Sequence, residues 1–201
     1  MTPFFLRGFS HLMRFTPGFI LVFALTLQVT AKQYEGRIVS VENGLVRLNE
    51  TNLKQTLDLT FKDADAALSI SKLKPDDFVS FEGVKNLTKS FLRVDSINYV
   101  GLAVLMGIWT GDDGYCYKFS SYTEFLIFPK SGDCNRKITR RSAPREFAYT
   151  LNVSDDNWFM LLSDARGRYA ADVAIISPKN VELSLYDVNN GNILRLIKLT
   201  K

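Results

Sequence analysis

The stretch Gly107–Phe119, GIWTGDDGYCYKF, lies near the middle of a chain of 201 residues and introduces the pattern of everything that follows it. A glycine and a tryptophan two positions later precede an acidic turn, Asp112-Asp113-Gly114, and then an aromatic segment that contains Cys116. Aspartate and glycine are typical turn residues, so the stretch predicts two short strands joined by a tight hairpin. We expect these two strands to begin a larger antiparallel sheet.

Short strands continue at a regular spacing after this hairpin. Apolar and polar residues alternate through Glu146–Leu151, and turn residues occur at Pro129–Gly132, Asp164–Gly167 and Ser177–Asn180. Short strands separated by regular turns are typical of an antiparallel meander that closes into a barrel. We therefore predict a barrel of about eight strands over residues 103–201.

The tripeptide Gly107-Ile108-Trp109 at the start of such a meander resembles the G-x-W signature of the lipocalin and calycin families. The resemblance implies that Trp109 plugs the closed end of the barrel and that an arginine from the last strand packs across the indole. Arg195 is the candidate, because it shares a strand face with Ile193 and Ile197, and an arginine over an indole is a favourable cation–π geometry. Gly107, Trp109 and Arg195 are thus the expected residues of barrel closure, in a unit shorter than a typical lipocalin.

Residues 32–102 show a different order of elements. The sequence predicts three strands, a short helix and two more strands, at Gly36–Val41, Leu45–Leu48, Thr56–Phe61, a helical face of Ala66, Ile70 and Leu73, Phe78–Phe81 and Phe91–Ile97. Asn43-Gly44 favours a type I′ hairpin turn, and Asp63 is a candidate helix N-cap. This order resembles the OB-fold. The predicted fold class is therefore mainly all-β, with two small antiparallel barrels: an OB-like one of five strands with one short helix, and a lipocalin-like meander.

Residues 1–31 have the pattern of a cleavable signal peptide. Arg7 and Arg14 precede the apolar run Phe19–Leu27, and Val29-Thr30-Ala31 offers small residues directly before a lysine. A retained membrane anchor is the alternative, but the apolar run is shorter than the roughly 20 residues that a spanning helix needs. We expect export to the periplasm or the extracellular space, with no permanent membrane span after cleavage.

Cys116 and Cys134 are the only two cysteines in the chain. A single pair of cysteines in a protein bound for an oxidising compartment predicts a disulfide bond. Two buried free thiols are the alternative, because unpaired cysteine behaves as a small apolar residue.

The composition excludes several classes of enzyme. His11 is the only histidine and falls within the predicted signal peptide, so the mature chain has no histidine for a nucleophile pair or a zinc site. No glycine-rich phosphate loop occurs. The acidic pairs Asp76-Asp77, Asp112-Asp113 and Asp155-Asp156 all fall at predicted turns, where aspartate forms local hydrogen bonds. We expect a non-enzymatic protein with no cofactor and no metal.

The most basic segment is 136–145, which contains Arg136, Lys137, Arg140, Arg141 and Arg145. Such a cluster suits an anionic partner, such as a phospholipid, lipid A, a polysaccharide or an acidic protein face. A solvated edge strand is the alternative, because charge on an edge strand opposes aggregation. Residues 32–102, in contrast, contain ten basic and ten acidic residues, so we expect no nucleic-acid binding by the OB-like unit.

Two functions remain open at this point. In the first, both barrels are filled by their own side chains, and an exported interaction or structural protein binds a protein or an anionic envelope component through its outer surface. In the second, the C-terminal barrel carries a small apolar ligand such as a lipid or a fatty acid. The candidate interior residues Phe147, Tyr149, Trp158 and Tyr169 are bulky, which favours a filled barrel.

Overall fold

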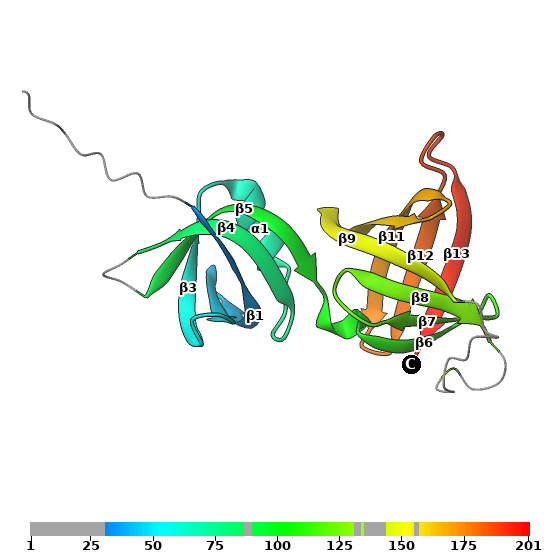
Figure 1. The fold of residues 1–201 in the computed structure, drawn as a ribbon, viewed down its shortest axis with the longest axis horizontal. Helices are drawn as coiled ribbons and strands as arrows, with labels where there is room; N and C mark the ends of the chain where they lie inside the picture. The colour runs from blue at the N-terminus through cyan, green and yellow to red at the C-terminus, as the bar shows by residue number, and fades with distance from the viewer. Residues whose placement is uncertain (1–30, 87–89, 131–133, 135–143, 155–156) are drawn as a thin grey trace, which may run out of the picture.

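The computed structural model describes residues 31–86, 90–130, 134, 144–154 and 157–201, which form two β-rich units (Figure 1). The N-terminal unit contains five strands and one short α-helix, and eight further strands form the C-terminal unit. This mainly β architecture confirms the predicted fold class. The predicted signal peptide lies outside the described residues, except for Ala31.

The five strands of the N-terminal unit form a closed ring. Its elements are β1 (Lys32–Glu42), β2 (Leu45–Glu50), β3 (Gln55–Phe61), α1 (Ala64–Ser71), β4 (Phe78–Lys85) and β5 (Phe91–Gly101). Each strand pairs with two neighbours, in the order β1–β2–β3–β5–β4 and back to β1. All pairs are antiparallel except β3–β5, which is parallel because α1 and β4 intervene between these two strands.

Local chemistry explains the turns and the helix start of this unit. Asn43 and Gly44, between β1 and β2, have φ angles of 50° and 78°, the left-handed conformation that a type I′ turn requires. The carboxylate of Asp63 accepts a hydrogen bond from the backbone N–H of Ala66 at 2.8 Å, which caps α1 as the sequence predicts. Ala66 and Ile70 then face the core.

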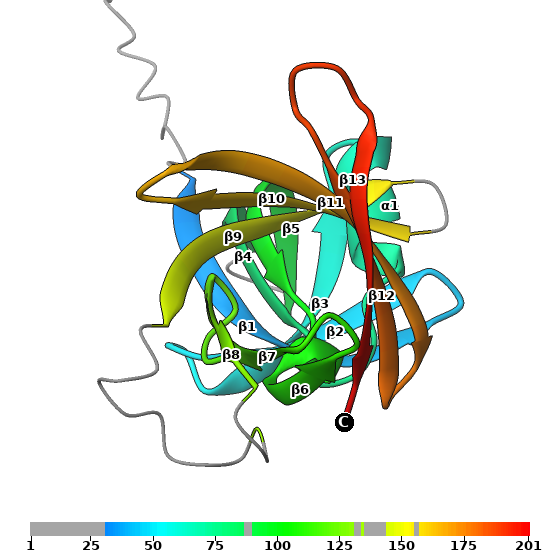
Figure 2. The same cartoon turned by 90° about the vertical axis from the view of Figure 1, so that its right-hand side faces the viewer.

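The C-terminal unit is an eight-stranded antiparallel meander closed into a barrel. Its strands are β6 (Gly107–Gly111), β7 (Tyr115–Phe119), β8 (Glu124–Pro129), β9 (Arg145–Ser154), β10 (Asn157–Asp164), β11 (Gly167–Ser177), β12 (Asn180–Tyr186) and β13 (Ile193–Thr200). Each strand pairs with the next, and β13 returns to β6 through Leu199 opposite Gly111 and Thr200 opposite Thr110. Figure 2 views this ring from the side away from the N-terminal unit.

The two units meet at one end of this barrel. The chain passes from β5 through the 3-10 helix η1 (Ala103–Leu105) directly into β6, and the backbone N–H of Ala103 donates to the buried carboxylate of Asp77 at 2.7 Å. In the β7–β8 loop, Tyr122 stacks on Phe78 with ring centroids 5.1 Å apart, and its hydroxyl accepts a hydrogen bond from Arg37 at 2.7 Å. These contacts cover the end of the barrel that faces the N-terminal unit.

Gly101, at the end of β5, offers a test of this junction. A methyl group at this position would collide with the Cβ, Cγ and Cδ1 atoms of Tyr122. We expect Gly101→Ala to lower the free energy of unfolding by about 1–3 kcal/mol in urea denaturation, because a close-packed junction does not absorb an added methyl group.

The double variant Gly101→Ala/Tyr122→Gly removes the colliding atoms and is the matched control. If the collision is the cause, the cost of Gly101→Ala should nearly vanish in the Tyr122→Gly background. An equal cost in both backgrounds would contradict the packing described here.

Candidate ligand-binding site

The inner face of the C-terminal barrel encloses a cavity of about 430 Å³. Alternate residues of β7 to β13 point inward, and the apolar part of the wall consists of Phe125, Ile127, Phe147, Met160, Leu162, Leu183, Leu185 and Ile197. The wall also includes Asp113, Arg166 and Pro129, which lie at or next to the turns farthest from the N-terminal unit. The cavity therefore opens at the end of the barrel away from the N-terminal unit.

The opposite end of the barrel is closed by Trp109. Its side chain is fully buried, and its indole N–H donates to the carbonyl of Leu105 at 2.7 Å. The ammonium group of Lys201 lies 4.4 Å from the centre of the indole ring and donates to the carbonyls of Val104 and Met106, each at 2.8 Å. Trp109 and Lys201 thus connect the start of β6, the end of β13 and η1.

The cation that covers Trp109 differs from the one expected. Arg195 lies nearer the open end, where its guanidinium is 3.5 Å from the carboxylate of Asp113. The reason is the register of closure, in which Thr200 pairs with Thr110 and so brings the next residue, Lys201, beside Trp109. Gly107 has a φ of +108°, and a side chain there would point toward Lys201.

Aromatic rings fill the closed part of the barrel. Phe119 meets Tyr149 edge to face at 5.6 Å between ring centroids, and the Tyr149 hydroxyl donates to the carbonyl of Ser121 at 3.1 Å. Phe147 lies farther toward the mouth, edge to face with Tyr169 at 6.0 Å, and both rings line the cavity. The interior is therefore filled at one end and hollow at the other.

Trp158, another of the four candidate interior residues, does not line the cavity, and neither does Tyr149. Trp158 is buried in the same core, but it also lines two clefts between the barrel and the N-terminal unit. Its position on β10, between Val153 of β9 and Val173 of β11, places it near the closed end. Trp158 thus lies away from the cavity that Phe147 and Tyr169 line.

The first charged pair of the mouth joins β9 to β10. The guanidinium of Arg145 donates to the carboxylate of Asp164 and lies 4.8 Å from the centre of the Phe147 ring. Asp164 is nearly buried and also accepts hydrogen bonds from the backbone N–H groups of Arg166 and Gly167 at 2.8 and 3.0 Å. The hydrogen bond from Arg145 lowers the pKa of Asp164, so this carboxyl is held in its charged form.

The second charged pair joins the β6–β7 turn to β13. Asp113 accepts hydrogen bonds from the Tyr115 backbone at 3.1 Å and from the Tyr117 hydroxyl at 2.7 Å, and Arg195 approaches the same carboxylate at 3.5 Å. Burial, and then the bond to Asp113, raises the pKa of the Tyr117 phenol. Arg166 is exposed, and within the described ranges its guanidinium forms no hydrogen bond or ion pair. Among the described residues, the mouth thus carries three guanidinium groups and two carboxylates.

Only one residue of the predicted basic segment can be placed. Arg136, Lys137, Arg140 and Arg141 lie outside the described residues. Arg145 lies on β9, which is paired on both sides, and its side chain lines the cavity mouth. The alternative of a solvated edge strand therefore does not hold for Arg145, because β9 is not an edge strand.

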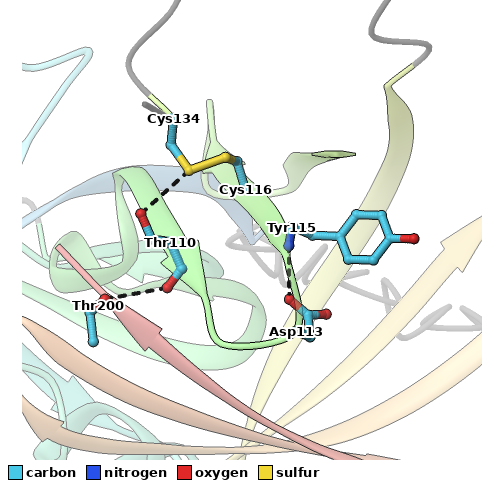
Figure 3. The surroundings of a disulfide bond; sticks show 6 residues. All are labelled: Thr110, Asp113, Tyr115, Cys116, Cys134 and Thr200. Carbon is cyan, nitrogen blue, oxygen red and sulfur yellow. Dashed lines mark hydrogen bonds between the residues drawn. A yellow bond between two sulfur atoms is a disulfide. The ribbon is translucent and has the colours of Figure 1, made fainter. Parts of the chain in front are cut away.

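The predicted disulfide is present and lies on the outside of the barrel (Figure 3). Cys116 lies between the cavity-lining Tyr115 and Tyr117 on β7, so its side chain points away from the cavity toward Cys134 and the buried ring of Phe128. A disulfide is typical of a protein that folds in an oxidising compartment. Helices long and apolar enough for a membrane span do not occur in the part of the chain that the structure describes.

Sequence reasoning missed Asp113, Asp164, Arg166 and Tyr117 as parts of one site. The sequence indicates only a turn role for the two aspartates, whereas in the structure both also pair with inward-facing arginines. One signal was available: Arg195 occupies a strand face that is otherwise apolar, which requires a partner inside the barrel. A search for acidic residues at the neighbouring turns would have found Asp113.

Comparisons of the chain with protein-family models, with curated proteins and with solved structures find no match. The described residues also hold no group of three or more histidine, cysteine, aspartate and glutamate side chains placed to bind a metal ion. The cavity, its charged mouth and the disulfide are therefore the observations from which a function can be argued.

The two cations can be distinguished by substitution. We expect Lys201→Gln to lower the free energy of unfolding by about 1 kcal/mol, because the indole loses its cation and two carbonyls lose a charged donor. Arg195→Gln should change it by less than about 0.5 kcal/mol, since its loose ion pair is half exposed to solvent. Urea denaturation of both variants decides the assignment, and the reverse ranking would restore Arg195 as the capping residue.

The disulfide should contribute measurably to stability. Replacing both cysteines with alanine should lower the free energy of unfolding by about 3 kcal/mol, because the unfolded chain regains the freedom of a closed loop. Reductant added to the wild-type protein should reproduce this loss and should have no effect on the Cys116→Ala/Cys134→Ala variant. A wild-type protein indifferent to reductant in urea would contradict the cross-link.

Proposed function

We propose that the C-terminal unit is a lipocalin-like barrel that binds one small ligand with an apolar body inside its cavity, within an exported protein. The Gly107-x-Trp109 pattern on the first strand, the buried indole at the closed end and the cation above it support the lipocalin-like assignment. The order of strands and helix supports an OB-like N-terminal unit. The disulfide between Cys116 and Cys134 supports export.

The cavity is the observation that carries this proposal. Its volume of about 430 Å³ lies within the range of about 300–1,000 Å³ that is usual for small-molecule sites. Eight strands give a barrel just wide enough for one small ligand. The wall is mostly aromatic and aliphatic, with polar groups gathered at the mouth, which is the usual arrangement of a site that orients an apolar molecule.

We propose binding without catalysis. Asp113 and Asp164, the two carboxylates of the mouth, each accept several hydrogen bonds and lie beside a guanidinium group. The hydrogen bond from Arg145 lowers the pKa of Asp164, and a carboxylate whose charged form is stabilised is a poor general base. The raised pKa of Tyr117 likewise keeps the phenol of this residue protonated.

An interaction role, with a protein or an anionic envelope component as partner, is the second candidate. It is favoured by four exposed apolar side chains on the β12–β13 hairpin, Val188, Ile193, Leu194 and Leu196. Apolar groups clustered on a surface often mark an interaction site. Leu194 and Leu196 alternate with the cavity-facing Arg195, so these two side chains and the cavity lie on opposite sides of β13.

Blocking the cavity tests the proposal. Leu185 lies on the cavity wall, and Leu185→Trp should fill much of the space, whereas Leu196→Trp adds the same ring on the outside of the neighbouring strand. Native mass spectrometry of the full chain against a panel of single-chain lipids should show one bound molecule per wild-type chain. Leu185→Trp should weaken this complex at least about tenfold, which corresponds to roughly 1.4 kcal/mol.

Leu196→Trp should bind as the wild type does. Thermal shift measurements on the same samples should show stabilisation by ligand for the wild type and Leu196→Trp only. If no lipid of the panel binds to the wild-type chain or stabilises it, the carrier proposal is wrong.

A further inference from the structure

We infer that the ligand is a single-chain amphiphile with one anionic group, a carboxylate or a phosphate, and that Arg195 and Arg166 receive this group at the mouth of the barrel. The inference rests on the proposed function, because it concerns the same cavity. It adds the chemical class of the ligand and the residues that recognise its charge.

The argument starts from how each guanidinium of the mouth is already engaged. Arg145 is held firmly: it donates to Asp164, approaches the Tyr169 hydroxyl at 3.4 Å and lies over the Phe147 ring. Asp164 is nearly buried beneath it. Arg145 therefore completes a pair built into the wall, and its departure would leave a buried carboxylate without its cation.

The guanidinium of Arg195 has N–H groups that are available to a further hydrogen-bond acceptor. Its only ion pair among the described residues is the 3.5 Å approach to Asp113, longer than a charge-assisted hydrogen bond. The oxygens of Asp113 are already used by the Tyr115 N–H and the Tyr117 hydroxyl. A guanidinium has five N–H donors in a planar fork, so most of those on Arg195 remain available to a second anion.

Arg166 adds a second available cation at the mouth of the cavity. It lies in the β10–β11 turn, lines the same cavity, and has no hydrogen bond or ion pair from its side chain within the described part of the chain. Among the described residues of the mouth, three arginines and two aspartates leave one guanidinium without a carboxylate partner. An anion at the opening balances this excess and accepts hydrogen bonds from two planar donors.

The apolar wall of the cavity determines the chemistry of the rest of the ligand. Below the arginines the cavity surface is formed by Phe147, Met160, Leu183 and Ile197, which offer no hydrogen-bonding group to a polar body. The charged groups are confined to one end, so a ligand with one charged end and one apolar chain matches both parts. A ligand without charge would leave the guanidinium groups of the mouth without an anion. A ligand with a charge at each end would place one of its charges against the apolar wall, which is costly.

The experiment compares three probes with the same chain: decanoate, decyl phosphate and decanol. Isothermal titration with the full-length protein at neutral pH and low salt should give at least one anion binding about ten to a hundred times more tightly than decanol, the gain expected for hydrogen bonds to a charged group. The tighter of the two anions identifies the head group. Added salt should weaken the anionic complex more than the decanol complex.

Variants assign the effect to the proposed residues. Arg166→Gln/Arg195→Gln should reduce the preference for the anion over decanol to about one, while a decanol complex persists. Arg168→Gln is the matched control, because Arg168 is an exposed neighbour on the outward face of β11 and does not line the cavity. This control should retain the full preference.

The outcomes separate the two proposals. Binding of neither anion nor decanol refutes the carrier function and this inference together. Equal binding of anion and decanol by the wild type, or a preference that survives in Arg166→Gln/Arg195→Gln, refutes the inference alone and leaves an apolar carrier.

Discussion

Two backbone pairs, Leu199 with Gly111 and Thr200 with Thr110, close the C-terminal barrel, and the rest of that unit depends on this register. Asp112 extends the seam, since its backbone and side chain both bond to the backbone of Lys198. Because side chains alternate along a strand, closure in this register sends Arg195, Ile197 and Leu199 inward. A slip of one residue would turn these side chains outward and abolish the cavity wall.

The course of the strands could be predicted from the sequence because it depends on local chemistry. The Asn43-Gly44 turn and the Asp63 cap need only their neighbours along the chain. The alternation of apolar and polar residues in β9 can likewise be recognised within one segment of the sequence. The pairing of Cys116 with Cys134 followed from there being no other cysteine. Local signals of this kind are strong enough to give the order of the elements in both units.

The partner of Trp109 could not be chosen in this way. Arg195 and Lys201 lie an even number of residues apart on the same strand line, so alternation assigns both to one face. Only the pairing of β13 with β6, a contact between distant segments, determines which of them reaches the indole. The hollow part of the barrel was missed for a related reason. A count of aromatic residues says nothing about how Phe119 and Tyr149 concentrate at one end.

The pairing of β6 with β13 also affects the order in which the strands of the barrel can fold. Thr110 and Thr200 are 90 positions apart in the sequence, so this contact closes a long loop and is costly in chain entropy. One edge of β6 stays unpaired until β13, seven strands later in the chain, has folded against it. An open strand edge invites pairing with other chains, and the adjoining charges of Asp112 and Asp113 oppose it. The acidic turn therefore lies next to the strand edge that is the last to be paired.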